Sequence, residues 1–347
     1  MNEVPPQNDL QPTLTYPSAA EDSETRARST EFTVCRPGPD EAVARDEVEV
    51  NRFGPYRLKE KLGAGGMGDV YEAEHTLLKR PCAIKFIRPG RDADEAAMNQ
   101  FAQEVRATAR LTHWNTVEIY DYGHTSDGSF YYVMELLPGL NLGELVKRHG
   151  PLVPDRALHF LRQVCRALGE AHATGLVHRD ITPANIFAAM RGGVHDVAKL
   201  LDFGLVKQRT NEAAGKPSAV PKGHFSGSPL YMSPEQATAY DEADARSDIY
   251  SLGAVAYYLL TGNPPFPGKT LLQVLAAHER DAVIAPSRIR TDLPDDLERI
   301  VLRCLEKAPN DRFQDAQTLR QALSECDGAN RWTEERAAAW WRDIEGR

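Results

Sequence analysis

Residues 56–75 read YRLKEKLGAGGMGDVYEAEH, and this stretch decides between two fold classes. Alternating polar and apolar residues before and after the glycines are typical of β-strands. The glycine-rich loop of a dinucleotide-binding fold is preceded by a strand and followed by a helix. Because a second strand follows the glycines here, the pattern disfavours a dinucleotide site and predicts a loop that bends between two strands.

The segments that follow continue a small β-rich region. RPCAIKFI (residues 80–87) and FYYVMELL (residues 130–137) have the composition of strands, and residues 93–111 have the spacing of a helix. We therefore predict a small β-rich N-lobe at about residues 56–137.

The chain after Pro138 has a mostly helical pattern. Residues 248–260, DIYSLGAVAYYLL, are apolar nearly all round, as expected of a helix buried in a core. We predict a larger α-helical C-lobe at about residues 138–325. The fold class is therefore α+β, with two lobes and no internal repeat.

The two ends of the chain differ from this central part. Residues 1–55 are rich in Pro, Glu, Asp, Ser and Thr, bury little apolar surface, and are predicted to form a disordered tail. Residues 331–346 are predicted to form an amphipathic helix, which Thr333 can cap. Its apolar face would pack on the domain or contact a partner protein. That face carries Ala337, Trp340, Trp341 and Ile344.

Composition and charge exclude several classes of protein. The net charge is −9, but residues 1–50 carry −7 of it, so the remainder is nearly neutral and gives no indication of nucleic-acid binding. The five cysteines lack metal-ligand spacing, which is typical of reduced thiols in a cytosolic protein. The start of the chain lacks the features of a signal peptide, and the apolar stretch 249–260 is too short to span a bilayer. We expect a cytoplasmic protein without a membrane segment.

Four groups of residues indicate a site that binds phosphate groups and acts on them. Gly63, Gly65 and Gly68 allow a backbone to approach phosphates, although this motif alone is weak evidence. Lys85, in the strand-like CAIK, could simply extend to solvent. However, Glu104 follows 19 residues later in the helical segment, where a helix packed on the strand can bring its carboxylate to the ammonium.

Two acidic motifs complete the set. HRDITPAN (residues 178–185) places Asp180 and Asn185 five positions apart, a spacing that fits a catalytic loop. In LLDFG, Asp202 follows an apolar run and Gly204 lets the backbone turn. Either aspartate taken singly could be a buried residue at a turn. Four elements in this order and at these intervals make coincidence negligible.

GAGGMGDV, CAIK, Glu104, HRDITPAN, DFG and SPE together resemble the signature motifs of protein kinases. The resemblance spans about residues 56–325 and includes GSPLYMSPE (residues 227–235), which is similar to a substrate-docking segment. The sequence MSPEQ and the short lobes are most similar to those of the bacterial eukaryotic-like (Hanks-type) serine/threonine kinases.

The resemblance implies a role for each of these residues. Asp180 would be the catalytic base, Lys85 and Glu104 would position the nucleotide, and Asn185 and Asp202 would hold Mg²⁺. ATP would donate its γ-phosphoryl group to serine or threonine of protein substrates, and the enzyme would phosphorylate itself. The nucleotide would be bound by Leu62, Gly63, Gly65, Gly68, Val70, Ala83, Lys85, Met134, Glu135, Leu137 and Phe187.

Within this set, Met134 would be the gatekeeper and residues 135–137 the hinge that binds adenine. Val70, Ala83 and Phe187 would sandwich the adenine ring.

Further positions follow from the same resemblance. Asp248 would brace the catalytic loop, and Arg312 would form an ion pair with Glu235. Arg179 and Lys207 would contact a phosphate on the activation loop. The candidate phosphorylation sites are Thr210, Ser218 and Ser226, of which we favour Ser226.

Two departures from the family pattern matter, one in the catalytic loop and one at Thr108. Thr182 stands where serine/threonine kinases usually carry lysine, and Ala184 stands where tyrosine-specific kinases carry arginine. Pro183 and the GSP at residues 227–229 favour serine and threonine as acceptors. Thr108, one helical turn after Glu104, replaces a larger apolar residue, so the active arrangement could need outside help.

Two alternatives remain open at this point. A pseudokinase scaffold is disfavoured by the intact catalytic residues. Measurement of ATP turnover distinguishes such a scaffold from an active kinase. A small-molecule phosphotransferase of related fold shares the Asp-to-Asn spacing but generally lacks the SPE segment and its arginine.

Overall fold

The protein was analysed as a computed structural model that describes residues 52–65, 68–87, 95–125, 129–203, 229–238 and 243–345. Most of the predicted disordered tail therefore lies outside the described residues. Its last residues are described, and Arg52–Phe53 forms a short strand within the segment that the sequence assigned to the tail.

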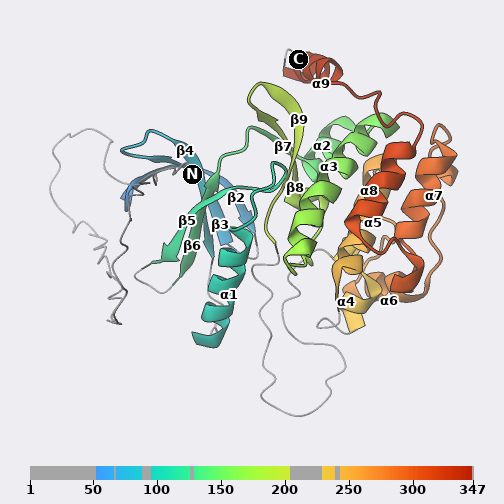
Figure 1. Ribbon diagram of the computed structural model, residues 1–347, viewed down its shortest axis with the longest axis horizontal. Coiled ribbons are helices and arrows are strands. Elements are labelled where there is room, and N and C mark those ends of the chain that lie inside the picture. Colours follow the sequence, from blue (N-terminus) through green and yellow to red (C-terminus); the bar gives the residue numbers. More distant parts are fainter. Residues whose placement is uncertain are drawn as a thin grey trace, which may run out of the picture. The chain divides into compact units, whose positions relative to one another are not determined.

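A six-stranded sheet forms the N-lobe, in the order β1-β2-β3-β4-β6-β5 (Figure 1). All neighbouring strands pair antiparallel. The predicted helix in this region is α1, Glu95–Thr108. The strands are β1 (Arg52–Phe53), β2 (Tyr56–Gly65), β3 (Gly68–His75), β4 (Pro81–Ile87), β5 (Ile119–His124) and β6 (Phe130–Glu135).

Alternation along the central strands gives this sheet two different apolar faces. On β6, Tyr132 and Met134 belong to a cluster that also contains Val105 of α1. Val133 belongs to a second cluster, with Tyr56 and other residues of the opposite face. A period of two residues therefore decides which β6 side chains meet the helix.

Gly68, at the start of β3, is required by close packing of two backbones. Its φ of +148° is unfavourable for residues with a side chain. A Cβ atom at this position would lie 1.8 Å from the carbonyl oxygen of Phe86 on β4. The last glycine of the motif thus allows β3 to pair tightly as it leaves the loop.

The C-lobe is built mainly of helices, as predicted. Its central helix α5 (Ala245–Thr261) is buried on nearly all sides. The side chain of Asp244 caps its first turn, and Gly262 ends it in the left-handed conformation. The other long helices are α2 (Leu142–His149), α3 (Pro154–Ala173), α6 (Leu271–Arg280), α7 (Asp295–Cys304) and α8 (Ala316–Glu325).

Shorter helical segments complete the C-lobe. They are η1 (Pro183–Asn185), η2 (Pro229–Tyr231), α4 (Pro234–Thr238), η4 (Pro286–Arg288) and η5 (Pro309–Asp311).

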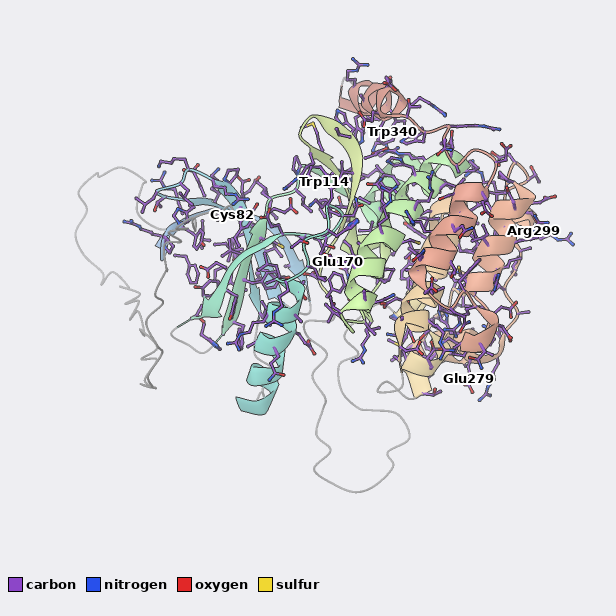
Figure 2. All side chains as sticks on the ribbon, in the orientation of Figure 1. Cys82, Trp114, Glu170, Glu279, Arg299 and Trp340 are labelled. Atoms are coloured by element: carbon purple, nitrogen blue, oxygen red, sulfur yellow. The ribbon has the colours of Figure 1, made fainter. Side chains whose placement is uncertain are left out.

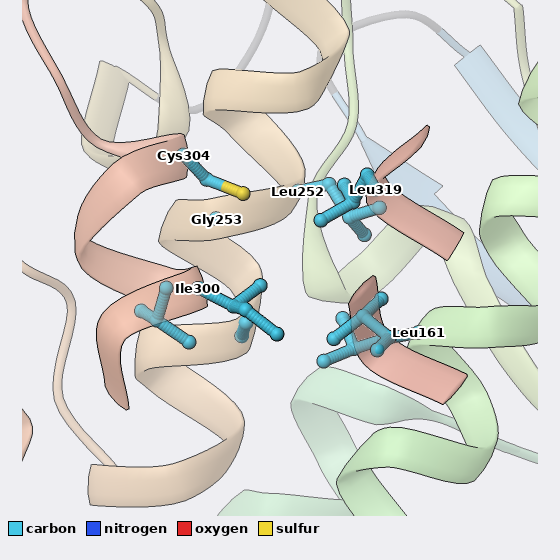
Figure 3. Close-up of a pocket in the computed structure, with 9 residues that line it drawn as sticks. Leu161, Leu252, Gly253, Ile300, Cys304 and Leu319 are labelled. Carbon is cyan, nitrogen blue, oxygen red and sulfur yellow. The ribbon is translucent and has the colours of Figure 1, made fainter. Parts of the chain in front are cut away.

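Helices α5 and α7 cross at Gly253. A Cβ atom there would lie 2.4 Å from Cβ of Cys304 on α7 (Figure 3). A small apolar pocket beside this crossing is lined by residues of α3, α5, α7 and α8, including Leu161, Ile300 and Leu319. Its lining carries no charged group, so we assign it to core packing.

A three-stranded sheet within the C-lobe was not predicted. It consists of β7 (Gly139–Asn141), β8 (Ile186–Arg191) and β9 (Val194–Leu200). Gly192 and Gly193 form the turn between β8 and β9, both with positive φ. A Gly-Gly pair between two short apolar runs is a hairpin signal, and it could have revealed these strands.

The predicted C-terminal helix is α9, Glu334–Glu345, and it packs on the domain (Figures 1 and 2). Thr333 caps it by accepting a hydrogen bond from the backbone nitrogen of Arg336 at 3.4 Å. Ala337 and Trp341 are buried, and the flanking Trp332 is buried too. Contact of this helix with a partner protein stays an untested alternative.

The four cysteines among the described residues are free and buried, in agreement with reduced thiols. None of the helices in the described part of the chain has the length and apolarity needed to cross a bilayer.

Candidate active site

Asp248 of α5 holds the catalytic loop by its main chain. Its carboxylate is fully buried and accepts hydrogen bonds from the backbone nitrogens of His178 (2.8 Å) and Arg179 (2.7 Å). His172 at the end of α3 lies 2.8 Å from the same carboxylate. The predicted bracing of the loop by Asp248 is therefore confirmed.

Asp180 and Asn185 lie together at the end of this loop. The amide nitrogen of Asn185 donates to the main-chain oxygen of Asp180 at 2.9 Å and to its carboxylate at 3.0 Å. The backbone oxygen of Asn185 accepts a hydrogen bond from Leu201 at 2.9 Å. The residue next to Leu201 is Asp202, so the two predicted acidic motifs meet.

Asp202 is held by two side chains from the N-lobe sheet. Nζ of Lys85 on β4 lies 2.6 Å from its Oδ2. The hydroxyl of Tyr132 on β6 donates to its Oδ1. Asp202 has a φ of +55°, a left-handed conformation that is uncommon for a residue other than glycine. Sequence reasoning missed Tyr132 because a tyrosine in an apolar strand carries no motif.

The surroundings of Asp202 favour its charged form. Burial opposes ionisation, but the Lys85 ammonium and the hydrogen bonds from Lys85 and Tyr132 outweigh it, so the pKa of Asp202 is lowered from its ordinary value. Burial, and then the Asp202 charge, raise the pKa of Tyr132 well above its ordinary value. The site therefore presents a carboxylate beside a neutral phenol.

Glu104 lies on α1 and is half-buried. One turn later, the hydroxyl of the buried Thr108 donates to the backbone oxygen of Glu104 at 3.0 Å. The predicted ion pair between Lys85 and Glu104 stays a prediction.

Three of the residues predicted to surround adenine belong to one apolar cluster. Ala83 and Met134 are buried and face each other across β4 and β6, and Val70 packs against the same cluster. Leu62 is 48% exposed at the glycine-rich loop. Phe187 is half-buried on β8 and pairs with Asn141 of β7.

The side chain of Glu135 connects the predicted hinge to the sheet of the C-lobe. Its buried carboxylate accepts a hydrogen bond from Lys199 of β9 at 2.6 Å and pairs with Arg191 of β8. Both cations lie near the ring of Trp114 (Figure 2). The Glu135 carboxylate is therefore engaged with two cations of the C-lobe sheet.

Glu235 of the SPE segment forms the predicted ion pair with Arg312. The contact is bidentate, at 2.6 and 2.9 Å, and Arg312 is fully buried. The hydroxyl of Ser247 adds a third hydrogen bond at 2.6 Å. This arrangement attaches the predicted substrate-docking segment to the C-lobe core.

Several predicted positions lie outside the described residues. These are Gly204, Lys207, Thr210, Ser218, Ser226 and the glycine and serine of the GSP at residues 227–229.

The chain belongs to the protein kinase domain family, whose model matches residues 56–324. The fold is the bilobal protein-kinase fold. The crystal structure of the Mycobacterium tuberculosis PknI kinase domain superposes with a TM-score of 0.61 at 28% identity, covering 79% of this chain and 97% of that one.

The chain is also similar in sequence to bacterial serine/threonine-protein kinases. Serine/threonine-protein kinase PknE of Mycobacterium tuberculosis is 38% identical over 265 residues, which are 76% of this chain and 45% of that protein. Serine/threonine-protein kinase pkn3 of Myxococcus xanthus is 34% identical over 278 residues, 80% of this chain and 50% of that protein. The chain thus spans about half the length of these relatives.

Proposed function

We propose that this protein is an ATP- and Mg²⁺-dependent protein kinase that phosphorylates serine or threonine in proteins, itself included. The observation that carries the proposal is the convergence of Lys85, Asp180, Asn185 and Asp202 at one place, from three separate segments. The family membership and the serine/threonine kinases among its relatives support the same reaction.

In this proposal Asp180 accepts the proton of the attacking hydroxyl, which turns the hydroxyl into a better nucleophile as the γ-phosphoryl group transfers. The hydrogen bond from Asn185 orients the Asp180 carboxylate. Lys85 exchanges its contact with Asp202 for the α- and β-phosphates, with Glu104 as its partner.

The donor chemistry fits Mg²⁺. Asp202 and Asn185 supply hard oxygen ligands, and the engagement of the Asn185 nitrogen with Asp180 leaves its amide oxygen for a cation. When bound, Mg²⁺ would offset charge on the β- and γ-phosphates. No group of three or more metal-ligating side chains occurs in the described ranges, in keeping with an ion that takes most of its ligands from phosphate and water.

The nucleotide would lie between the glycine-rich loop and the hinge. Val70, Ala83 and Phe187 would contact the base, Met134 would lie at its inner end, and the main chain at Glu135 and Leu137 would bind its edge. Leu62, Gly63, Gly65 and Gly68 would cover the ribose and phosphates. The cytoplasmic location expected from the sequence stays a prediction.

The bidentate contact between Glu235 and Arg312 favours a protein substrate over a small molecule. It anchors the segment that would dock a peptide, which small-molecule phosphotransferases of related fold generally lack.

The test is phosphate transfer by the purified chain. With Mg²⁺ and ATP, it should label a generic protein and itself on serine or threonine, as located by mass spectrometry. Asp180→Asn should keep its melting temperature and nucleotide binding but lose roughly 10²-fold in rate. Equal rates for the two proteins would refute the role of Asp180, and ATP binding without turnover in the wild type would indicate a pseudokinase.

A further inference from the structure

Tyr132 connects the N-lobe sheet to Asp202. It lies on β6 directly opposite Lys85 of β4, and its side chain is 1% exposed. It shares a sheet face with Met134, whereas its neighbour Tyr131 packs on the opposite face. The strand pairing thus aims a lysine and a tyrosine from adjacent positions at one carboxylate.

The two oxygens of Asp202 are divided between these residues. Lys85 donates to Oδ2, and Tyr132 donates to Oδ1. In the proposed reaction Lys85 turns to the phosphates of ATP and Oδ2 becomes available. Tyr132 has no contact with ATP in the proposed reaction, so its hydrogen bond to Oδ1 of Asp202 can persist throughout.

The chemistry of the two donors differs. A buried hydroxyl without a partner is costly, so a tyrosine at this depth needs an acceptor, and Asp202 is the acceptor present. The phenol is neutral and does not repel a cation on the other oxygen. Carboxylates that bind metals are commonly held by hydrogen bonds, and loss of such a bond typically weakens metal binding or activity roughly 10- to 100-fold.

We propose that Tyr132 is a positioning residue that holds one oxygen of Asp202 and so presents the other to the metal ion of the ATP complex. This inference rests on the proposed function, because it assumes that Asp202 is a metal ligand.

The test compares Tyr132→Phe with the matched control Tyr131→Phe. Both changes remove one hydroxyl from neighbouring positions of β6, but only Tyr132 contacts Asp202. Binding of a non-hydrolysable ATP analogue is followed by calorimetry at increasing Mg²⁺. We expect Tyr132→Phe to raise the Mg²⁺ concentration for half-maximal binding by about tenfold. Analogue binding without Mg²⁺ should stay within about twofold of wild type, and Tyr131→Phe should match wild type in both measurements.

A purely structural role would give a different pattern. It would lower the melting temperature without moving the Mg²⁺ requirement. An unchanged or lower Mg²⁺ requirement in folded Tyr132→Phe overturns the inference, and so does an equal shift in Tyr131→Phe. If Tyr132→Phe does not fold, Tyr132→Met supplies an unbranched apolar replacement for the same comparison.

The two proposals fail in different ways. If wild-type protein binds no nucleotide with Mg²⁺ at all, the proposed function fails. If it binds normally and Tyr132→Phe does the same, only the role of Tyr132 is lost.

Discussion

Asp196 and Asp202, two aspartates six residues apart, differ in what surrounds their carboxylates. Both have a left-handed φ, +56° and +55°, and both contact a cation. Asp196 is fully buried on β9, where Arg156 binds it in a bidentate contact at 2.8 Å through each nitrogen. Asp202 keeps 19% side-chain exposure and contacts one lysine and one tyrosine.

The remaining donors to Asp196 come from the C-terminal segment. The indole nitrogens of Trp332 and Trp341 donate to it at 2.9 and 2.7 Å. The ring of Trp340 covers the Arg156 guanidinium at 3.7 Å from the ring centroid. Four hydrogen bonds, two from Arg156 and one from each of these indoles, therefore reach the Asp196 carboxylate.

One residue type thus has a structural setting at Asp196 and an exchangeable contact at Asp202. At Asp196 a complete set of rigid donors offsets the loss of hydration, so the carboxylate joins α3, β9 and α9. At Asp202 a flexible lysine leaves one contact exchangeable. This comparison predicts separate outcomes for changes at the two sites.

The largest effect is expected on activity at Asp202. Asp202→Asn should lower kcat on the order of 10³-fold, because a neutral amide stabilises a metal and its phosphates far less. The melting temperature should change little. Steady-state kinetics and thermal unfolding of the same preparation test this. A large loss of stability in Asp202→Asn would show that Asp202, like Asp196, has a structural role.

Asp196→Asn should show the reverse pattern. It leaves the guanidinium of Arg156, which is 2% exposed, without a charged partner. We expect a loss of about 3 kcal/mol in unfolding free energy, and a fall of about 6–10 °C in melting temperature. Assays well below that temperature should retain activity close to wild type. Unchanged thermal stability would refute the structural role.

Two tryptophan variants test how much the hydrogen bonds to Asp196 contribute to stability. Trp341→Phe keeps an aromatic ring but removes a donor to a buried charge, and should cost about 1.5–3 kcal/mol. Trp340→Phe keeps the ring over Arg156 and removes no donor to Asp196, so its cost should be smaller. Chemical denaturation measures both, and equal costs would show that ring packing alone holds α9.

A third carboxylate, Glu235, adds a pH dependence. Burial opposes its ionisation, but hydrogen bonds from Arg312 and Ser247 outweigh this and lower its pKa below the ordinary 4.5. Since the folded pKa is lower than the unfolded one, the pair stabilises the fold above about pH 4.5. This stabilisation is lost as pH falls through the folded pKa. Melting temperatures from pH 7 to 3 should show a smaller decline in Glu235→Gln, and parallel curves would contradict this.

The smallest effect is expected at Thr182, in the loop that carries Asp180. A lysine is usual here in serine/threonine kinases, and its charge would act mainly on the transferring phosphoryl group. Thr182→Lys should therefore raise kcat several-fold with little change in the KM for ATP. Steady-state kinetics decides it. An unchanged or lower kcat would show that the site already accommodates threonine.

Local patterns in the sequence were sufficient for much of the fold and site. The strands around the glycine-rich loop, α1 and α9 follow from periods of two and 3.6 residues, and α5 follows from a run that is apolar nearly all round. The contact between Glu235 and Arg312, 77 residues apart, followed from family motifs and was confirmed. The strands β8 and β9 were missed, because the two runs are short and the hairpin signal of Gly192 and Gly193 between them was not used.

The fold class, the family resemblance and the candidate catalytic residues could be predicted without a structure, because residue periodicity and the order of motifs can be read along the chain. The side chains that contact each buried carboxylate became known from the packing of the folded chain. It placed Tyr132 on Asp202, Glu135 on Lys199, and the tryptophans of the C-terminal segment on Asp196. These partners lie 64 to 145 residues apart. Which side chain satisfies a buried carboxylate depends on strand pairing and helix packing, which no local pattern records.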